Sequence, residues 1–80
     1  MRSAFFEQTI ECEERNELAR LEAHLRIRLR DYVYDFRIAI RDGELVLYGS
    51  AGTYYGKQLA QHGVMERCRL PIRANNINVP

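Results

Sequence analysis

Leucines recur at helical spacing in the first half of the chain, within a run of charged residues. The intervals are three, four and four residues, so these side chains line one face of a helix. The set comprises Leu18, Leu21, Leu25 and Leu29. Glutamates precede it and arginines end it, an order that complements the helix dipole. The pattern predicts a helix between Thr9 and Arg30, with Thr9 or Asn16 as its N-cap.

Two stretches of alternating apolar and polar residues predict a β-hairpin. They flank Asp42-Gly43, a pair that favours a two-residue type I′ turn because both turn positions need a positive φ. A loop of this length fixes the strand pairing. The predicted pairs are Arg41 with Glu44, Ile40 with Leu45, Ala39 with Val46, Ile38 with Leu47 and Arg37 with Tyr48.

The two faces of this hairpin differ in character. One is apolar and should contact the core. The other comprises Arg37, Ala39, Val46 and Tyr48. We expect this second face to be exposed, with Arg37 stacked on Tyr48. It is available to Phe5 and Phe6 of an N-terminal arm, to a second copy of the chain, or to solvent. A homodimer is favoured, because a short chain gains core from association.

A glycine-rich bend separates the hairpin from a second helix. Gly49 and Gly52 are interpreted as turn glycines, as is Gly43 in the hairpin. Thr53 is a suitable N-cap for a helix over residues 54–69, which Pro71 stops because proline disfavours helical backbone in the preceding residue. A short β-like run follows at residues 72–79.

The predicted order is therefore α-β-β-α-β, an α+β domain with two helices packed on one face of a three-stranded mixed sheet. A right-handed crossover places the third strand parallel to the second, and its position in the strand order stays open. Residues 1–16 are assigned to an N-terminal arm or helix extension, and residues 17–80 to the domain.

Composition limits the functional classes. The 80 residues make one domain, and the net charge of +1 gives no overall field that would attract a polyanion. Cys12 and Cys68 match no zinc or redox spacing, so both are expected as reduced thiols. His24 and His62 form no metal or catalytic pattern, and no cofactor is expected. Without a signal peptide or a transmembrane segment, the chain is expected in the cytoplasm.

Three segments together resemble the BON domain of bacterial proteins. They are the hairpin residues 41–49, the helix start 55–60 with its lysine and small residues, and the closing 75–79. The likeness extends from about Leu18 to Val79. It implies a non-catalytic module that binds phospholipids or proteins and is often associated with the cell envelope.

Two surfaces are candidates for binding. The outward face of the first helix combines cations with an exposed apolar residue, and it comprises Arg20, Arg26, Ile27 and Arg30. Such a face suits anionic lipid head groups. The bend from Gly49 to Gly52 matches the Gly-x-x-Gly loop of KH domains, which leaves nucleic-acid binding as a disfavoured alternative. The pair Tyr54-Tyr55 is interpreted first as ordinary packing at a helix end, and second as a membrane-interface anchor.

The sequence therefore predicts a binding module without enzymatic activity, with lipid head groups or a protein as its partner, including a second copy of itself.

Overall fold

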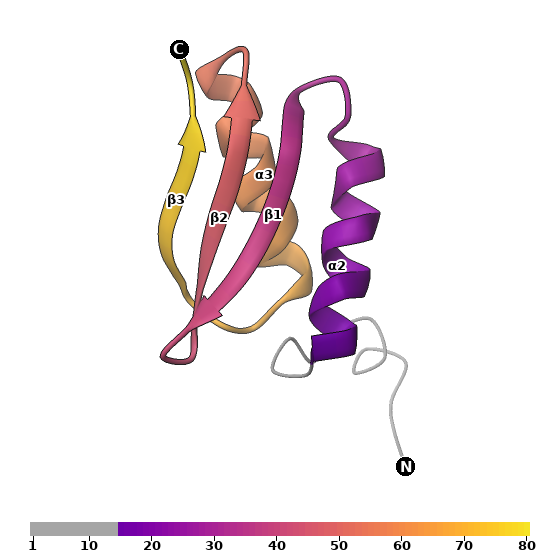
Figure 1. The fold of residues 1–80 in the computed structure, drawn as a ribbon, viewed down its shortest axis with the longest axis vertical. Helices are drawn as coiled ribbons and strands as arrows, with labels where there is room; N and C mark the ends of the chain where they lie inside the picture. The colour runs from indigo at the N-terminus through magenta and orange to yellow at the C-terminus, as the bar shows by residue number, and fades with distance from the viewer. Residues whose placement is uncertain (1–14) are drawn as a thin grey trace.

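The computed structural model describes residues 15–80 and contains two helices and three strands (Figure 1). These are α2 (Arg15–Arg28), β1 (Val33–Arg41), β2 (Glu44–Ala51), α3 (Tyr54–Arg67) and β3 (Ile72–Asn78). The strands form one sheet of order β1-β2-β3, in which β1 is antiparallel to β2 and β2 is parallel to β3. The predicted order α-β-β-α-β and the mixed sheet are confirmed. Phe5, Phe6 and Thr9 lie outside the described residues.

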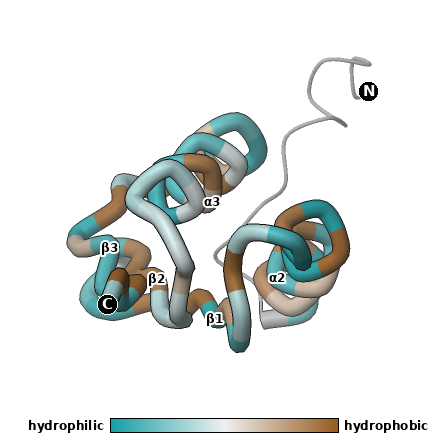
Figure 2. Tube along the Cα trace, turned by 90° about the horizontal axis from the view of Figure 1, so that it is seen from above, coloured by the Kyte–Doolittle hydropathy of each residue, from teal (hydrophilic) through white to brown (hydrophobic). Residues whose placement is uncertain are grey.

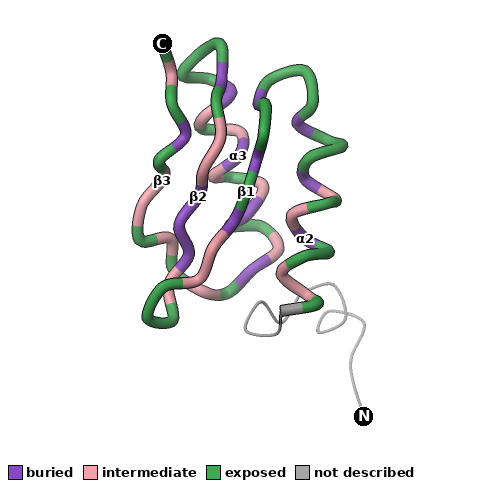
Figure 3. Tube along the Cα trace, in the orientation of Figure 1, coloured by how far each residue is buried: buried purple, intermediate pink, exposed green. Residues whose placement is uncertain are grey.

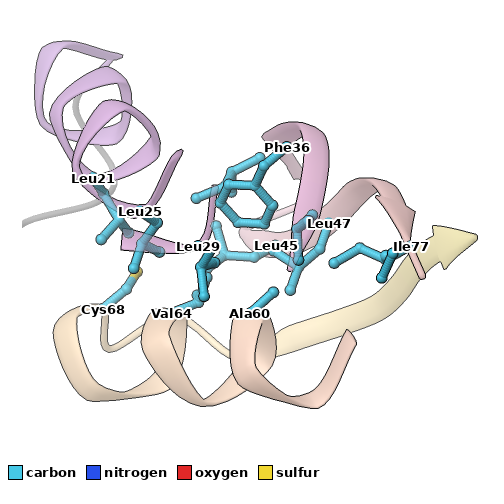
Figure 4. Close-up of a cluster of buried hydrophobic side chains, with 13 residues drawn as sticks. Leu21, Leu25, Leu29, Phe36, Leu45, Leu47, Ala60, Val64, Cys68 and Ile77 are labelled. Carbon is cyan, nitrogen blue, oxygen red and sulfur yellow. The ribbon is translucent and has the colours of Figure 1, made fainter. Parts of the chain in front are cut away.

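Both helices pack on the same side of the sheet, as predicted. Seen from above, α3 lies over the sheet whereas α2 lies beside β1, at the sheet's edge (Figure 2). The leucine stripe of α2 is buried, with Leu21, Leu25 and Leu29 between 0% and 7% exposed. It meets Ala60 and Val64 of α3 and the inward side chains of the strands in one core (Figure 4). A single apolar layer therefore holds all five elements together.

The hairpin has the predicted register. All five predicted pairs occur, from Arg37 with Tyr48 to Arg41 with Glu44. Asp42 and Gly43 have φ values of 54° and 79°, as a type I′ turn requires. At its other end β1 begins earlier than the alternation indicates, and its pairing shifts between Tyr34 and Arg37. Asp35 lies in this bulge with a φ of 54°, a left-handed conformation that aspartate tolerates better than most residues.

Gly49 was expected in a turn, and that prediction is wrong. It lies inside β2, which continues to Ala51, and its φ is 147°. The β1 bulge passes so close that a Cβ at Gly49 would be 2.9 Å from the carbonyl oxygen of Tyr34. Only glycine satisfies both constraints. The turn itself is shorter than predicted and comprises Gly52 and Thr53.

Helix α3 begins as predicted and ends early. The Thr53 hydroxyl accepts a hydrogen bond from the Gly56 N–H at 3.2 Å, which caps the first turn. The helix stops at Arg67, because Cys68 is already extended with a φ of −132°. Its small residues permit the expected close packing: a Cβ at Gly63 would lie 2.9 Å from a methyl group of Leu25 on α2.

Cys68 corrects the expectation of reduced thiols. The residue is disulfide-bonded and only 6% exposed. The other cysteine of the chain, Cys12, lies outside the described residues.

Candidate anion-binding site

The exposed edge of β1 is closed by two side chains of α2. The Ile38 N–H donates to the Glu22 carboxylate at 2.8 Å, and Arg26 Nε donates to the Phe36 carbonyl oxygen at 2.8 Å. Glu22 and Arg26 are one helical turn apart and form an ion pair of 3.5 Å. Edge strands carry unpaired backbone groups that must be satisfied or covered. This clamp satisfies two of them and fixes the direction of the Arg26 side chain.

Beyond the clamp, an open groove of about 490 Å³ lies between the end of α2 and the start of β1. Three of its lining residues are cationic, namely Arg26, Arg30 and Arg37, and one is acidic, Asp35. Arg26 is engaged by the clamp. Neither Arg30 nor Arg37 has an ion-pair or hydrogen-bond partner within residues 15–80. Two guanidinium groups are therefore available to an anion, each with donors arranged for carboxylate or phosphate oxygens.

A second, wider groove of about 650 Å³ adjoins the first on the outer face of the sheet. Arg37 and Asp35 line both grooves, and the second adds Arg41, Ala39 and Tyr48. Arg26 and Arg30, predicted on the helix face, therefore share one continuous surface with Arg37, predicted on the sheet face. The sequence suggested two separate surfaces, and the structure joins them at Arg37.

Two residues of the predicted helix face stay apart from this site. Arg20 pairs with Glu17 at 3.9 Å on the solvent side of α2 and lines neither groove. Ile27 is 69% exposed, as expected, and it too lies outside the grooves. The helix face is thus divided between a groove-lining half and a solvated half.

The outer sheet face is less open than the sequence indicates. Val46, expected to be exposed, is only 4% exposed. It occupies the central strand directly between Ala39 and Ala74, and Tyr48 follows two residues along on the same face. Neighbouring side chains on a sheet lie close enough to shield a small residue in this position. Within the described residues the expected stacking of Arg37 on Tyr48 is absent, although the two are paired.

Among the titratable groups of the described residues, His24 has a clearly shifted pKa. Burial lowers the pKa of His24 below its usual 6.5, and the charges of Arg67 and Arg28 lower it further. Its Nε2 atom is buried and has no hydrogen-bond partner among residues 15–80. His24 lines neither of the two grooves, so a role in the anion site has no support. In the same part of the chain, no three His, Cys, Asp or Glu side chains come close enough to hold a metal ion.

Sequence reasoning missed Tyr32, Tyr34 and Asp35. They fall between the predicted first helix and the predicted first strand, where no periodicity draws attention to them. Tyr34 and Asp35 line the arginine groove, and Tyr32 contacts Tyr55 with ring centres 5.7 Å apart. The two tyrosines close to Asp31 were the only sequence feature that could have pointed to this segment.

None of the described helices is long and apolar enough to cross a bilayer. Comparisons of the chain with models of protein families, with curated proteins and with solved structures find no match.

Proposed function

We propose that this chain is a non-catalytic, BON-like binding module whose ligand is an anionic phospholipid head group. The observation that carries the proposal is the pair Arg30 and Arg37, two exposed arginines that line one groove and have no ion-pair or hydrogen-bond partner among the described residues. The α-β-β-α-β order and the Asp42-Gly43 hairpin are consistent with the BON-like part of the proposal.

Anionic lipids fit this groove for electrostatic reasons. The chain as a whole is nearly neutral, so attraction must come from a local group of charges. Basic residues near an anionic bilayer each contribute about 1 kcal/mol. The groove is open, which suits a ligand that forms part of an extended surface. Asp35 reduces the positive charge of the groove without cancelling it.

The two other partners considered receive less support. The KH-like alternative needs a flexible Gly-x-x-Gly loop, but Gly49, Ser50 and Ala51 are strand residues and Ala51 is 1% exposed. Self-association through the outer sheet face needs accessible apolar area, and Val46 supplies very little of it. We therefore place the partner surface at the arginine groove.

Vesicle co-sedimentation tests the proposal. The protein should pellet with vesicles of phosphatidylcholine and phosphatidylglycerol at low salt, but not with phosphatidylcholine alone. Replacing both groove arginines, R30Q/R37Q, should remove about 2 kcal/mol of attraction, a loss in affinity of roughly 30-fold. Added salt should weaken binding by the wild-type protein, since exposed charges are screened over about 8 Å at physiological ionic strength.

The matched control is R20Q/R73Q, which removes the same charge away from the groove. Arg20 pairs with Glu17, and Arg73 pairs with Asp42 at 3.2 Å near the hairpin turn. In each pair at least one partner is largely exposed, so the pairs contribute little to stability. The control should keep near wild-type binding. Equal losses of vesicle affinity in the two double variants would mean that only net charge matters, and would contradict binding at the groove.

A further inference from the structure

Four of the five tyrosines gather at one end of the molecule. Tyr32 directly precedes β1 and Tyr34 is the second residue of β1, whereas Tyr54 and Tyr55 begin α3. The α2–β1 and β2–α3 connections lie at the same end, and the residues of these two loops are mostly exposed (Figures 1 and 3). The four residues are 42%, 59%, 63% and 60% exposed, respectively. So much aromatic surface in solvent is costly for a chain of this size unless something covers it.

The two tyrosine pairs are held together by backbone packing. A Cβ at Gly56 would lie 2.8 Å from the carbonyl oxygen of Tyr32, so α3 and the connection before β1 are in close contact. The rings of Tyr32 and Tyr55 meet edge to face, at an interplanar angle of 77°. Tyr32 and Tyr55 are thus held in contact, and Tyr34 and Tyr54 lie close to them in the sequence. We term this region the tyrosine end and define it as Tyr32, Tyr34, Tyr54 and Tyr55.

Cations accompany this surface. Tyr34 lines the arginine groove with Arg30 and Arg37. Tyr32 lines a depression between the helices with Arg28, and Tyr54 lines another with Lys57. The acidic residues nearby are Asp31, Asp35 and Glu66, the last in the same depression as Arg28, so four cations face three carboxylates and the excess of positive charge is small. Aromatic rings with polar tips, surrounded by cations, are the side chains that favour the boundary between lipid head groups and acyl chains.

We propose that the tyrosine end enters the head-group layer of an anionic bilayer while Arg30 and Arg37 hold lipid phosphates at its margin. The inference rests on the proposed function and adds to it an orientation. The β1 start and the first turn of α3 face the membrane, whereas the hairpin turn and the end of α3 point away from it. Tyrosine hydroxyls remain hydrated in this arrangement, and the ring carbons leave water.

The absence of tryptophan from the chain permits a direct test. Y54W places a single tryptophan in the tyrosine end. M65W places one near the opposite end of α3, at a residue of similar exposure, 60% against 63%. Each variant is mixed with vesicles of phosphatidylcholine and phosphatidylglycerol, with and without brominated acyl chains. The Y54W emission should shift to the blue and be quenched by the brominated lipid, and the M65W emission should stay unchanged.

The outcomes separate the two proposals. If both variants pellet with the vesicles but Y54W shows neither shift nor quenching, or M65W shows the larger change, the orientation is overturned and lipid binding survives. If neither variant nor the wild-type protein pellets, lipid binding and orientation are both refuted. A second variant, Y54S/Y55S, should lower vesicle affinity several-fold while leaving the circular dichroism spectrum intact, and unchanged affinity would also overturn the inference.

Discussion

The carboxylate of Glu22 accepts a hydrogen bond of 2.8 Å from the backbone N–H of Ile38, sixteen residues further along the chain. A helix side chain thereby takes the place of a neighbouring strand at the edge of β1. Arg26, one turn later on α2, completes the arrangement by donating to the Phe36 carbonyl oxygen. The same clamp that closes the sheet edge also fixes one wall of the arginine groove.

Removing the carboxylate should open this edge. E22A leaves the Ile38 N–H without its acceptor and releases Arg26 from its ion pair, so the free energy of unfolding should fall by about 1–3 kcal/mol. Urea denaturation measures this change. Hydrogen exchange at the Ile38 amide should accelerate more than exchange at residues of β2, because β2 is paired on both sides.

Two further variants test whether the loss of stability in E22A comes from the hydrogen bond to Ile38. E22Q retains an acceptor oxygen and should recover part of the loss. E17A removes a carboxylate that is 28% exposed and pairs with the exposed Arg20, and it should change stability by less than about 0.5 kcal/mol. A loss in E17A as large as in E22A would show that the hydrogen bond to Ile38 has no particular importance.

Gly49 and Gly52 offer a matched pair, because only one of them is conformationally constrained. G49A should destabilise the protein by about 2–4 kcal/mol, since the new Cβ meets the Tyr34 carbonyl oxygen and the φ of 147° is unsuitable for alanine. A Cβ at Gly52 meets no atom within 4 Å. G52A should therefore be close to neutral. Thermal unfolding compares the two, and equal effects would contradict the close approach of β1 to Gly49.

Stability should decline on acidification because of His24. Its folded-state pKa is lowered by burial and by Arg67 and Arg28, so the unfolded chain binds the proton more tightly. Above the unfolded-state pKa of about 6.5, His24 does not change the free energy of unfolding. As the pH falls from there towards the folded-state pKa, His24 lowers the free energy of unfolding. H24Q should remove this part of the loss as the pH falls below about 6.5, whereas H62Q should retain it. Identical acid profiles for the wild-type protein and H24Q would refute the prediction.

The oxidation state of Cys68 can be measured with a thiol reagent. Denatured, unreduced protein should show no free thiol in a reaction with Ellman's reagent, because the cysteine is disulfide-bonded. Reduction should lower the urea midpoint, since losing a disulfide from a small domain typically costs about 2–5 kcal/mol. Free thiols in the unreduced sample would contradict the disulfide and support the reduced thiols that the sequence predicted.

Features encoded by adjacent residues were predictable from the sequence. Asp42-Gly43 fixes its turn through its own backbone preferences, and the strict alternation on both sides then fixes the register. The leucine spacing of α2 likewise predicts its buried face, since the helical period is an intrinsic property of the chain.

Features that depend on contacts between distant segments were not predictable. The bulge at Asp35 accompanies a strand whose edge is held by Arg26 of α2, and its close approach determines why residue 49 is glycine. Val46 has the pattern of an exposed residue, but its neighbours on both strands shield it. The arginine groove and the tyrosine end each combine segments that are separate in the sequence.

The most direct test of the account is nuclear magnetic resonance of the labelled protein titrated with anionic bicelles containing phosphatidylglycerol. We expect the largest shift changes at the Nε–H groups of Arg30 and Arg37 and at the backbone amides of residues 30–37. Binding that instead perturbs Arg20, Ile27 and the solvent side of α2, or a spectrum that stays unchanged throughout the titration, would contradict the central claim that the groove between α2 and β1 holds the anion.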